Sequence, residues 1–325
     1  MTEYSPLGPG REFDLIRTVI ERLPDHNDLI VGPGDDAAVL ADGWVVSVDA
    51  SVENIHFRRE WLSPAEIGSR AVIVALSDLA AMAAIPVATF VSLVLPSTDY
   101  RDVAPELLQG AAQATRDYGA ALAGGDTTRS EAGLVIAVTV FGRTNHPVLR
   151  SGASVGDEVW VTGELGAAAA AVLAWNSNAM ADQAARAAFA RPAARVREAL
   201  WLSERVKLNA LIDLSDGLAS DAAHIAAASS VALRLETGFL PVHPSARTQP
   251  EGLRLAAAGG DDYELCLVAP AGALGKVKRE FEQQFQLRLT RIGTVEPGAG
   301  VIWLDDNGRP LEGPLKGFDH FDRHG

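Results

Sequence analysis

A long apolar stretch that contains a single acid constrains this chain most. Residues 71–82 are almost wholly apolar, and Ser63-Pro64-Ala65-Glu66 precedes them. This tetrapeptide has a hydroxyl residue for the N-cap, proline at the first helical position and glutamate at the third, which is typical of a helix start. We therefore predict a helix from about residue 64 to residue 84, ending before Pro86.

Asp78 is the one acid within that apolar stretch. An unpaired buried carboxylate costs several kcal/mol, so such a group must be paired, protonated or bound to a metal ion. The alternative is that Asp78 belongs to a polar face of the helix together with Ser69 and Ser77.

Glycine turns followed by acids recur along the chain. Acids also stand at the ends of other predicted strands. Together, the acids at glycine turns and strand ends are Asp35, Asp36, Asp49, Asp126, Asp213, Asp216, Asp261 and Asp262. We expect residues 123–128 (Ala-Gly-Gly-Asp-Thr-Thr) to form a loop between regular elements, in which glycine lets backbone amides approach a ligand. Carboxylate oxygens in such places suit Mg²⁺ or Ca²⁺. The alternative for 123–128 is a tight turn with a solvated aspartate.

Strands and helices alternate over the whole length, which predicts an α/β (α+β) protein. A chain of 325 residues is long enough for two domains. The polar segment 143–156 contains one proline and two glycines, so we place the boundary there and predict domains 1–148 and 149–325. The main predicted strands are 37–41, 44–49, 87–95, 134–142, 158–162, 209–214, 231–236, 263–268, 287–295 and 301–304. The main predicted helices are 13–23, 64–84, 102–118, an alanine-rich one after Gly166, 179–190, 193–206, 218–229 and 271–285.

Charge and cysteine content narrow the function classes. The formal net charge is −14, which disfavours binding to nucleic acid or to anionic membranes. It would also repel a phosphorylated substrate, unless metal ions neutralise some of the carboxylates. Cys266 is the only cysteine, so an intramolecular disulfide and a cysteine-based zinc site are excluded, and we expect it to be buried. No apolar run reaches the ~18 residues of a membrane span, and the first thirty residues lack a signal-peptide core. We therefore expect a cytoplasmic protein.

Familiar nucleotide-binding signatures are missing. The chain has no Walker A motif, no protein-kinase motifs, no Rossmann fingerprint and no EF-hand spacing. An enzyme that uses ATP without them must neutralise the triphosphate in another way, and Mg²⁺ ions on aspartates would do this. Phosphoryl transfer depends mainly on alignment and charge stabilisation, so the acids permit this chemistry without proving it.

Eight motifs in order resemble those of the thiamine-monophosphate kinase family, over about residues 12–321. They are Gly34-Asp35-Asp36, Asp49 with His56-Phe57, Leu76-Ser77-Asp78-Leu79-Ala80-Ala81-Met82, Gly124-Gly125-Asp126-Thr127-Thr128, Arg150-Ser151-Gly152-Ala153, Asp213-Leu214-Ser215-Asp216-Gly217-Leu218, Gly259-Gly260-Asp261-Asp262-Tyr263-Glu264-Leu265 and Gly317-Phe318-Asp319-His320-Phe321.

The resemblance implies a two-domain fold like that of aminoimidazole-ribonucleotide synthetase. In that fold the mixed sheet of the N-terminal domain forms a barrel with a second copy in a homodimer, and a C-terminal α/β domain completes the site. It also implies ATP-dependent, Mg²⁺-dependent phosphorylation of thiamine monophosphate to thiamine diphosphate, by direct in-line attack of the substrate phosphate on the γ-phosphorus.

The resemblance also implies a role for individual residues. Mg²⁺ would be held by Asp35, Ser47, Val48, Asp49, Asp78, Asp126, Asp213 and Asp216. ATP would contact Gly125, Asp126, Arg150 and Ser215. The thiamine moiety would face His56, Asp261 and Phe318. Asp126 and Asp216 would be catalytic.

Three positions depart from the family pattern. Val48 replaces a hydroxyl residue, so that any metal contact there uses its backbone carbonyl. Asp261 replaces glutamate and is shorter by one methylene, and Phe318 replaces tyrosine or tryptophan and lacks the polar tip. Taken singly, His56 suits a structural histidine, Phe318 a packing residue and Arg150 a surface arginine.

Two other functions compete with the kinase. Another ATP enzyme of the superfamily is one, but a selenophosphate synthetase usually has a reactive cysteine near its N-terminus, far from Cys266. A non-catalytic nucleotide- or metal-binding dimer is the other.

Overall fold

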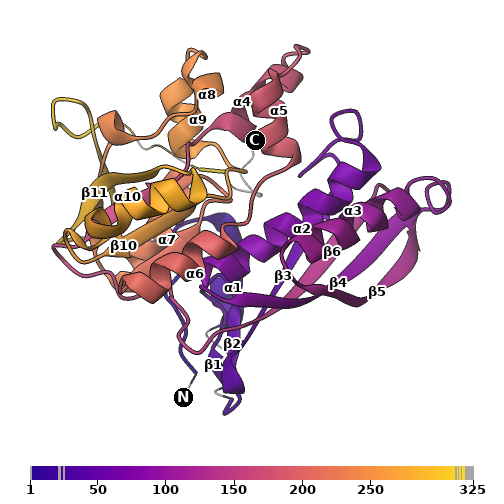
Figure 1. The fold of residues 1–325 in the computed structure, drawn as a ribbon, viewed down its shortest axis with the longest axis horizontal. Coiled ribbons are helices and arrows are strands. Elements are labelled where there is room, and N and C mark those ends of the chain that lie inside the picture. The colour runs from indigo at the N-terminus through magenta and orange to yellow at the C-terminus, as the bar shows by residue number, and fades with distance from the viewer. Residues whose placement is uncertain are drawn as a thin grey trace.

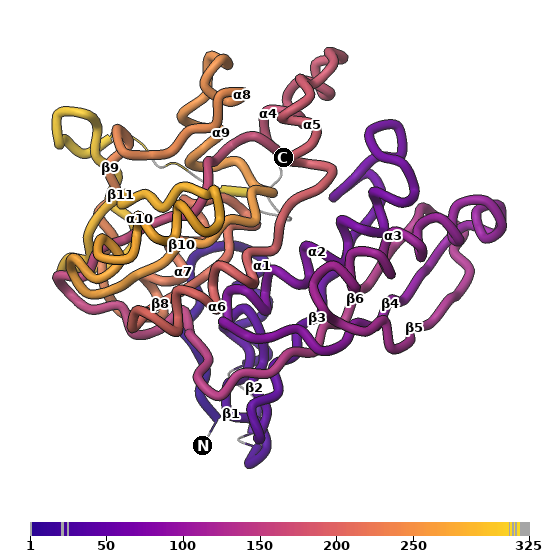
Figure 2. Tube along the Cα trace, viewed as in Figure 1, coloured from indigo at the N-terminus to yellow at the C-terminus, as the bar shows by residue number. Residues whose placement is uncertain are grey.

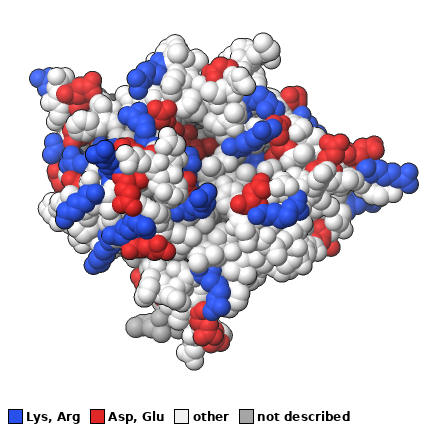
Figure 3. All heavy atoms as spheres, in the orientation of Figure 1, with Lys and Arg blue, Asp and Glu red and all other residues white. Residues whose placement is uncertain are grey.

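The protein has two lobes, each built on one six-stranded sheet (Figure 1). The computed structural model describes residues 2–20, 23–24, 26–311, 313, 315 and 317–318. Within these residues, none of the helices combines the length and the apolar character that a membrane crossing requires. Acidic and basic side chains are interspersed on the face shown in Figure 3.

The first lobe contains a mixed sheet, as the resemblance implied. Its strands lie in the order β1-β2-β3-β6-β4-β5, and only the β4–β5 pair is parallel. They are β1 (Leu29–Val31), β2 (Ala38–Leu40), β3 (Trp44–Val52), β4 (Ile85–Pro96), β5 (Ala121–Ser130) and β6 (Val135–Arg143). The short 3-10 turn Ala41–Gly43 joins β2 to β3, so the hairpin predicted there is confirmed.

Two helices, α2 (Pro64–Ala81) and α3 (Ala104–Asp117), lie side by side across one face of this sheet (Figure 1). The predicted start of α2 is confirmed, since Ser63 and Glu66 form a reciprocal capping box. The helix ends three residues earlier than expected. Its apolar side chains are buried because α2 contacts both lobes: it packs on β3 and β6 and also on α6 and β8 of the second lobe.

The predicted loop at residues 123–128 is wrong, since these residues lie inside the edge strand β5. Gly125 allows this because a Cβ atom at its position would collide with the carbonyl oxygen of Val91 on β4. The register between β4 and β5 also shifts at Thr89/Phe90. A glycine within a strand marks a bulge or a close backbone approach as readily as glycine marks a loop.

The second lobe places helices on both faces of its sheet. The strand order is β12-β9-β11-β7-β10-β8. The strands are β7 (Glu158–Thr162), β8 (Ala210–Asp213), β9 (Ala232–Glu236), β10 (Leu265–Ala269), β11 (Leu289–Glu296) and β12 (Gly300–Leu304). The helices are α4 (Ala167–Asn176), α5 (Gln183–Ala190), α6 (Val196–Arg205), α7 (Leu218–Ser229), α8 (Pro244–Arg247), α9 (Gly252–Ala258) and α10 (Ala273–Phe285). The sequence predicted all of these except α8 and α9. Alternate residues of the strands enter two cores, one on the α7 face and one shared with α2.

The N-terminal segment ties the two lobes together, as the path of the chain in Figure 2 shows. It ends in α1 (Arg11–Ile20), where the sequence predicted a helix over 13–23; residues 21 and 22 lie outside the described part. The backbone N–H of Gly8 donates a hydrogen bond of 3.0 Å to Nδ1 of His224 on α7, and the Phe13 ring packs on the same imidazole at 4.1 Å between centroids. Glu3 pairs with Val31 of β1 in the first lobe, so the segment contacts one lobe through Glu3 and the other through Gly8 and Phe13.

Candidate active site

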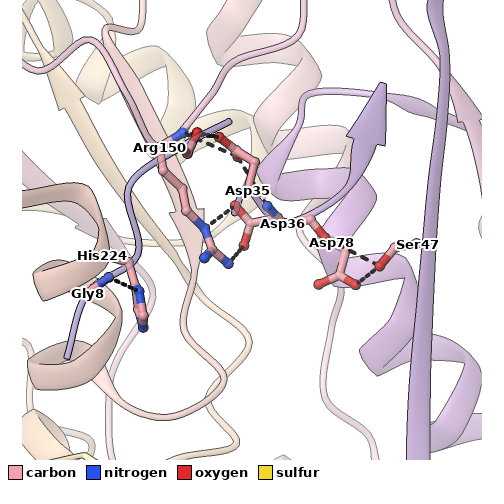
Figure 4. A network of polar contacts seen from close by, with 8 residues as sticks. Gly8, Asp35, Asp36, Ser47, Asp78, Arg150 and His224 are labelled. Atoms are coloured by element: carbon pink, nitrogen blue, oxygen red, sulfur yellow. Dashed lines mark hydrogen bonds and ion pairs between the residues drawn. The ribbon is translucent and has the colours of Figure 1, made fainter. Parts of the chain in front are cut away.

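The turn before β2 carries two acids with different partners (Figure 4). Asp36 accepts two hydrogen bonds from the Arg150 guanidinium, at 2.7 and 3.1 Å. Asp35 accepts one from the backbone N–H of Arg150 at 3.1 Å and one from the Ser5 hydroxyl at 3.0 Å. Burial, reinforced by the adjacent charge of Asp36, raises the pKa of Asp35 to about 6. Arg150, expected to contact ATP, thus holds both acids of this turn.

Three carboxylates from three distant parts of the chain meet next to this pair. Asp36, Asp78 of α2 and Asp213 at the end of β8 each offer an oxygen, and these oxygens lie within 4.8 Å of one another. Ser47 donates a hydrogen bond of 2.5 Å to Oδ2 of Asp78, which fixes its rotamer. Asp78 is therefore partnered, and it belongs to a cluster rather than to a solvated polar face.

The cluster holds protons more tightly than separate acids would. Burial first, and then the charges of Asp213 and Asp49, raise the pKa of Asp78 well above its ordinary value. Burial and the charge of Asp36 raise the pKa of Asp213 to about 7. Clustered carboxylates repel one another when all are ionised, and a divalent cation removes that repulsion. The all-oxygen donor set fits Mg²⁺.

Asp213 begins a turn that leads into α7. Leu214 to Gly217 form this turn, and Gly217 takes a positive φ of 100° that favours glycine. The turn packs against the 259–264 loop, because the backbone N–H of Asp261 donates to the carbonyl of Ser215 at 2.8 Å. The N–H of Phe318 donates to the carbonyl of Asp216 at 3.0 Å. The 213–217 turn, the 259–264 loop and the segment at Phe318 are therefore in contact with one another.

A cavity of about 490 Å³ lies between the lobes at this point. Most of the residues predicted for the site line it: Val48, Asp49, His56, Asp78, Asp213, Ser215, Asp216, Asp261 and Phe318. The other walls include aromatic and apolar side chains, among them Trp61, Val74, Val172, Phe189 and Tyr263. Asp35, Ser47 and Arg150 do not line the cavity, but each is hydrogen-bonded to Asp36 or to Asp78. The cavity therefore has both an acidic and an aromatic wall.

His56 and Phe318, which the resemblance implied would face the thiamine moiety, both line the cavity. Nδ1 of His56 accepts a hydrogen bond of 3.0 Å from the backbone N–H of Val52, which orients the imidazole at the cavity wall. Phe318 lines the cavity and is about half exposed. Asp319, His320 and Phe321 of the last motif lie outside the described residues.

Gly125 and Asp126 do not join this group within one chain. Asp126 lies in a row across the sheet with Ser92, Ala137 and Ala50. Three strand spacings place its backbone about 14 Å from Ala50 of β3. The neighbouring row contains Asp49 and two valines buried under the helices, and successive side chains of a strand point to opposite faces. Asp126 is thus on the uncovered face and Asp49 on the helix-covered one.

Asp36 was among the acids expected to suit a metal ion, but the resemblance gave it no ligand role, and Arg70 was not among the predicted site residues. Asp36 was one of two adjacent acids, and only the fold shows which of the two points at Asp78 and Asp213. Arg70 lies two helical turns before Asp78 on α2, and its guanidinium binds Asp261 of the cavity wall. The spacing of Arg70, Val74 and Asp78 by four residues places them on one face of α2, and this was the available signal.

Cys266 is fully buried on β10, where burial raises the pKa of its thiol. The expectation of a buried cysteine is therefore confirmed.

Comparisons with known proteins agree with this architecture. The N-terminal domain of AIR synthase related protein matches residues 34–144, and its C-terminal domain matches residues 154–304. A thiamine-monophosphate kinase of Bacillus subtilis (strain 168) is 34% identical over 95% of this chain and 99% of its own length. The thiamine-monophosphate kinase of Escherichia coli (strain K12) is 33% identical over 95% and 98%.

Solved structures extend the likeness to three dimensions. The thiamine-monophosphate kinase of Stenotrophomonas maltophilia K279a is 34% identical, with a TM-score of 0.75 over 93% of this chain and 98% of that one. AaThiL complexed with AMPPCP and TMP is 28% identical, with a TM-score of 0.80 over 96% and 97%. The hydrogenase maturation protein HypE, at 18% identity and a TM-score of 0.73, shares the fold. The resemblance seen in the motifs is thus confirmed, and the chain belongs to the thiamine-monophosphate kinase family.

Proposed function

We propose that the protein transfers the γ-phosphoryl group of ATP to thiamine monophosphate, giving thiamine diphosphate and ADP. The observation that carries the proposal is the convergence of carboxylates from both lobes on a cavity that also has aromatic walls. Such a cavity suits a ligand with a phosphate at one end and aromatic rings at the other. The relative that binds AMPPCP and TMP supports the same assignment.

The acids would hold Mg²⁺ between the lobes. Asp36, Asp78 and Asp213 form the central set, with Asp49 and Asp216 on the cavity wall and Asp35, Ser47 and Val48 beside them. Bound Mg²⁺ would neutralise and align the triphosphate. Ser47 orients Asp78 and Arg150 orients Asp36, so these ligands are held in place before the substrates arrive.

The remaining residues would position the two substrates. Ser215 and the 213–217 turn would contact the nucleotide phosphates, and His56, Asp261 and Phe318 would face the thiamine rings. An oxygen of the substrate phosphate would attack the γ-phosphorus in line while the bond to the β-phosphate oxygen breaks. The attacking phosphate is already anionic, so this step needs no general base, and the protein contributes alignment and charge stabilisation.

Asp126 would act from a second copy of the chain. The uncovered face of the first sheet exposes Val48 and Phe90 and ends at the exposed edge strand β5. We propose that two such faces close into the barrel of a homodimer, which would bring Asp126 and Gly125 of one copy to the cavity of the other. We also keep the division at residues 148 and 149; the gap between the two matched family domains supports it.

The test is turnover with purified substrates. Incubation with ATP, Mg²⁺ and thiamine monophosphate should release ADP and thiamine diphosphate in equal amounts, and ADP release that does not need thiamine monophosphate would contradict the proposal. Asp78→Asn should abolish turnover and keep the fold. Asp117→Asn is the matched control, because Asp117 is an exposed acid at the end of α3.

A further inference from the structure

Arg70 is a buried cation that links the two lobes. It lies on α2 and is 5% exposed. One of its nitrogens donates a hydrogen bond of 2.6 Å to the carbonyl of Phe189, and another binds Oδ1 of Asp261. Its guanidinium also lies over the Phe189 ring, 4.2 Å from the centroid. The planar group is thus fixed on three sides, which a lysine could not reproduce.

Asp261 is held as firmly as its partner. The Tyr263 hydroxyl donates to the same Oδ1 atom at 3.1 Å. Asp261 and Tyr263 both have positive φ, 73° and 50°, although neither is glycine. Backbone strain of this kind persists where the surrounding contacts determine the conformation, and it is concentrated at functional sites.

Only one oxygen of Asp261 remains for a ligand. Oδ1 receives both donors, and among the residues that the structure describes no hydrogen bond reaches Oδ2. The side chain is 30% exposed and lines the cavity. Because the charge of Arg70 offsets that of Asp261, the free oxygen serves as an oriented hydrogen-bond acceptor more than as a counter-ion.

The position of Arg70 along α2 indicates which part of the substrate the Arg70–Asp261 pair contacts. Arg70 and Asp78 are two turns apart, or about 12 Å along the axis, and Val74 of the cavity wall lies between them. Asp78 belongs to the acidic cluster, whereas Arg70 packs on Phe189, whose ring contacts that of Trp61 at 5.8 Å. A substrate whose phosphate lies at Asp78 would therefore extend its rings toward Asp261.

We propose that Arg70 is a positioning residue that sets substrate specificity: it binds Oδ1 of Asp261 and so turns Oδ2 toward the amino group of the substrate's pyrimidine ring. This inference rests on the proposed function.

The test compares variants of the full-length protein. Arg70→Gln removes the cation, Arg70→Lys keeps the charge without the planar contacts, and Arg70→Lys with Asp261→Glu exchanges the lengths of the two partners. Arg186→Gln is the matched control: Arg186 on α5 pairs with Glu66 of α2 at 2.9 Å, also across the lobes, but neither residue lines the cavity. Calorimetry measures thiamine-monophosphate binding without ATP, and kinetics give KM for each substrate.

Arg70→Gln should weaken thiamine-monophosphate binding by roughly 10- to 100-fold, the loss expected for a hydrogen bond to a charged group. KM for ATP should not change, and the lysine–glutamate pair should recover most of the loss. Wild type should prefer thiamine monophosphate to the analogue with a carbonyl in place of the pyrimidine amino group, and Arg70→Gln should lose that preference.

Equal effects of Arg70→Gln and Arg186→Gln, or a parallel rise in both KM values, would overturn the inference and leave only a structural role. If Arg70→Gln does not fold, Arg70→Lys with unchanged binding and preference would overturn it as well. An active wild type with an indifferent Arg70 variant refutes this inference alone, whereas a wild type that does not bind thiamine monophosphate refutes the proposed function.

Discussion

Arg150 binds both oxygens of Asp36, and Asp36 in turn lies within ligand distance of Asp78 and Asp213. Arg150, in the segment that joins the lobes, therefore stabilises Asp36, one of the three clustered carboxylates. The Asp36 side chain is 1% exposed, so this charge has little access to water. An Asp36 carboxylate left without Arg150 should therefore destabilise the interface between the lobes.

Removal of one member of this pair should cost more than removal of both. Arg150→Met leaves a buried, uncompensated carboxylate and should lower the free energy of unfolding by roughly 3–5 kcal/mol. The double variant Asp36→Asn/Arg150→Met should be less destabilised than Arg150→Met alone. Urea unfolding of Arg150→Met, Asp36→Asn and the double variant measures the three values, and a double variant whose loss equals the sum of the two single losses would contradict this coupling.

Magnesium binding should weaken as the pH falls below about 7. The pKa of Asp213 is raised to about 7 and that of Asp78 well above its ordinary value, so the metal-free protein holds protons that bound Mg²⁺ must displace. For each proton displaced, the apparent affinity should fall about tenfold per pH unit below that value. Titration calorimetry in two buffers of different ionisation enthalpy counts the released protons, and binding without proton release would contradict the expectation.

His224 should make the protein less stable in mild acid. Burial lowers its pKa from 6.5 to about 3, so the unfolded chain binds a proton at pH 5 that the folded protein does not. Its contribution is therefore complete above pH 6.5 and is lost as the pH falls toward 3. Between pH 7 and pH 5 the loss is about 2 kcal/mol.

The difference in free energy of unfolding between wild type and His224→Gln, followed against pH, separates this effect from that of the buried acids. The raised pKa values of those acids change the stability in the opposite direction. The variant should lack the His224 part of the pH dependence of unfolding. Identical pH profiles for the two proteins would show that the imidazole titrates alike in the folded and unfolded states.

Asp126 should complement a defect in the partner subunit. Asp78→Asn and Asp126→Asn should each be inactive alone. If Asp126 serves the cavity of the other copy, each mixed dimer contains one intact site, so equal mixing after unfolding and refolding should restore about a quarter of wild-type turnover. An Asp126 that acts within its own chain would give no recovery.

The sequence predicted elements whose signals are local. The capping box set the start of α2, and helix 218–229 was predicted with its observed bounds because a glycine turn precedes it. The prediction failed where contacts between residues far apart in the chain determine the local structure. Gly124-Gly125 fits both a loop and a bulged strand, and only pairing with β4 selects the strand. Asp35 and Asp36 are equivalent in the local sequence, and their roles differ only because Arg150, from the segment between the lobes, and Asp213, from the second lobe, contact Asp36 differently.

The proposed function requires carboxylates of both lobes to share divalent metal ions with a bound nucleotide. Crystals grown with Mn²⁺, a non-hydrolysable ATP analogue and thiamine monophosphate would test this by anomalous scattering. We expect Mn²⁺ peaks among Asp36, Asp78 and Asp213, bridging to the phosphates, with the thiamine rings near Asp261. A bound nucleotide whose phosphates lie away from these acids, with no metal peak between them, would contradict the account.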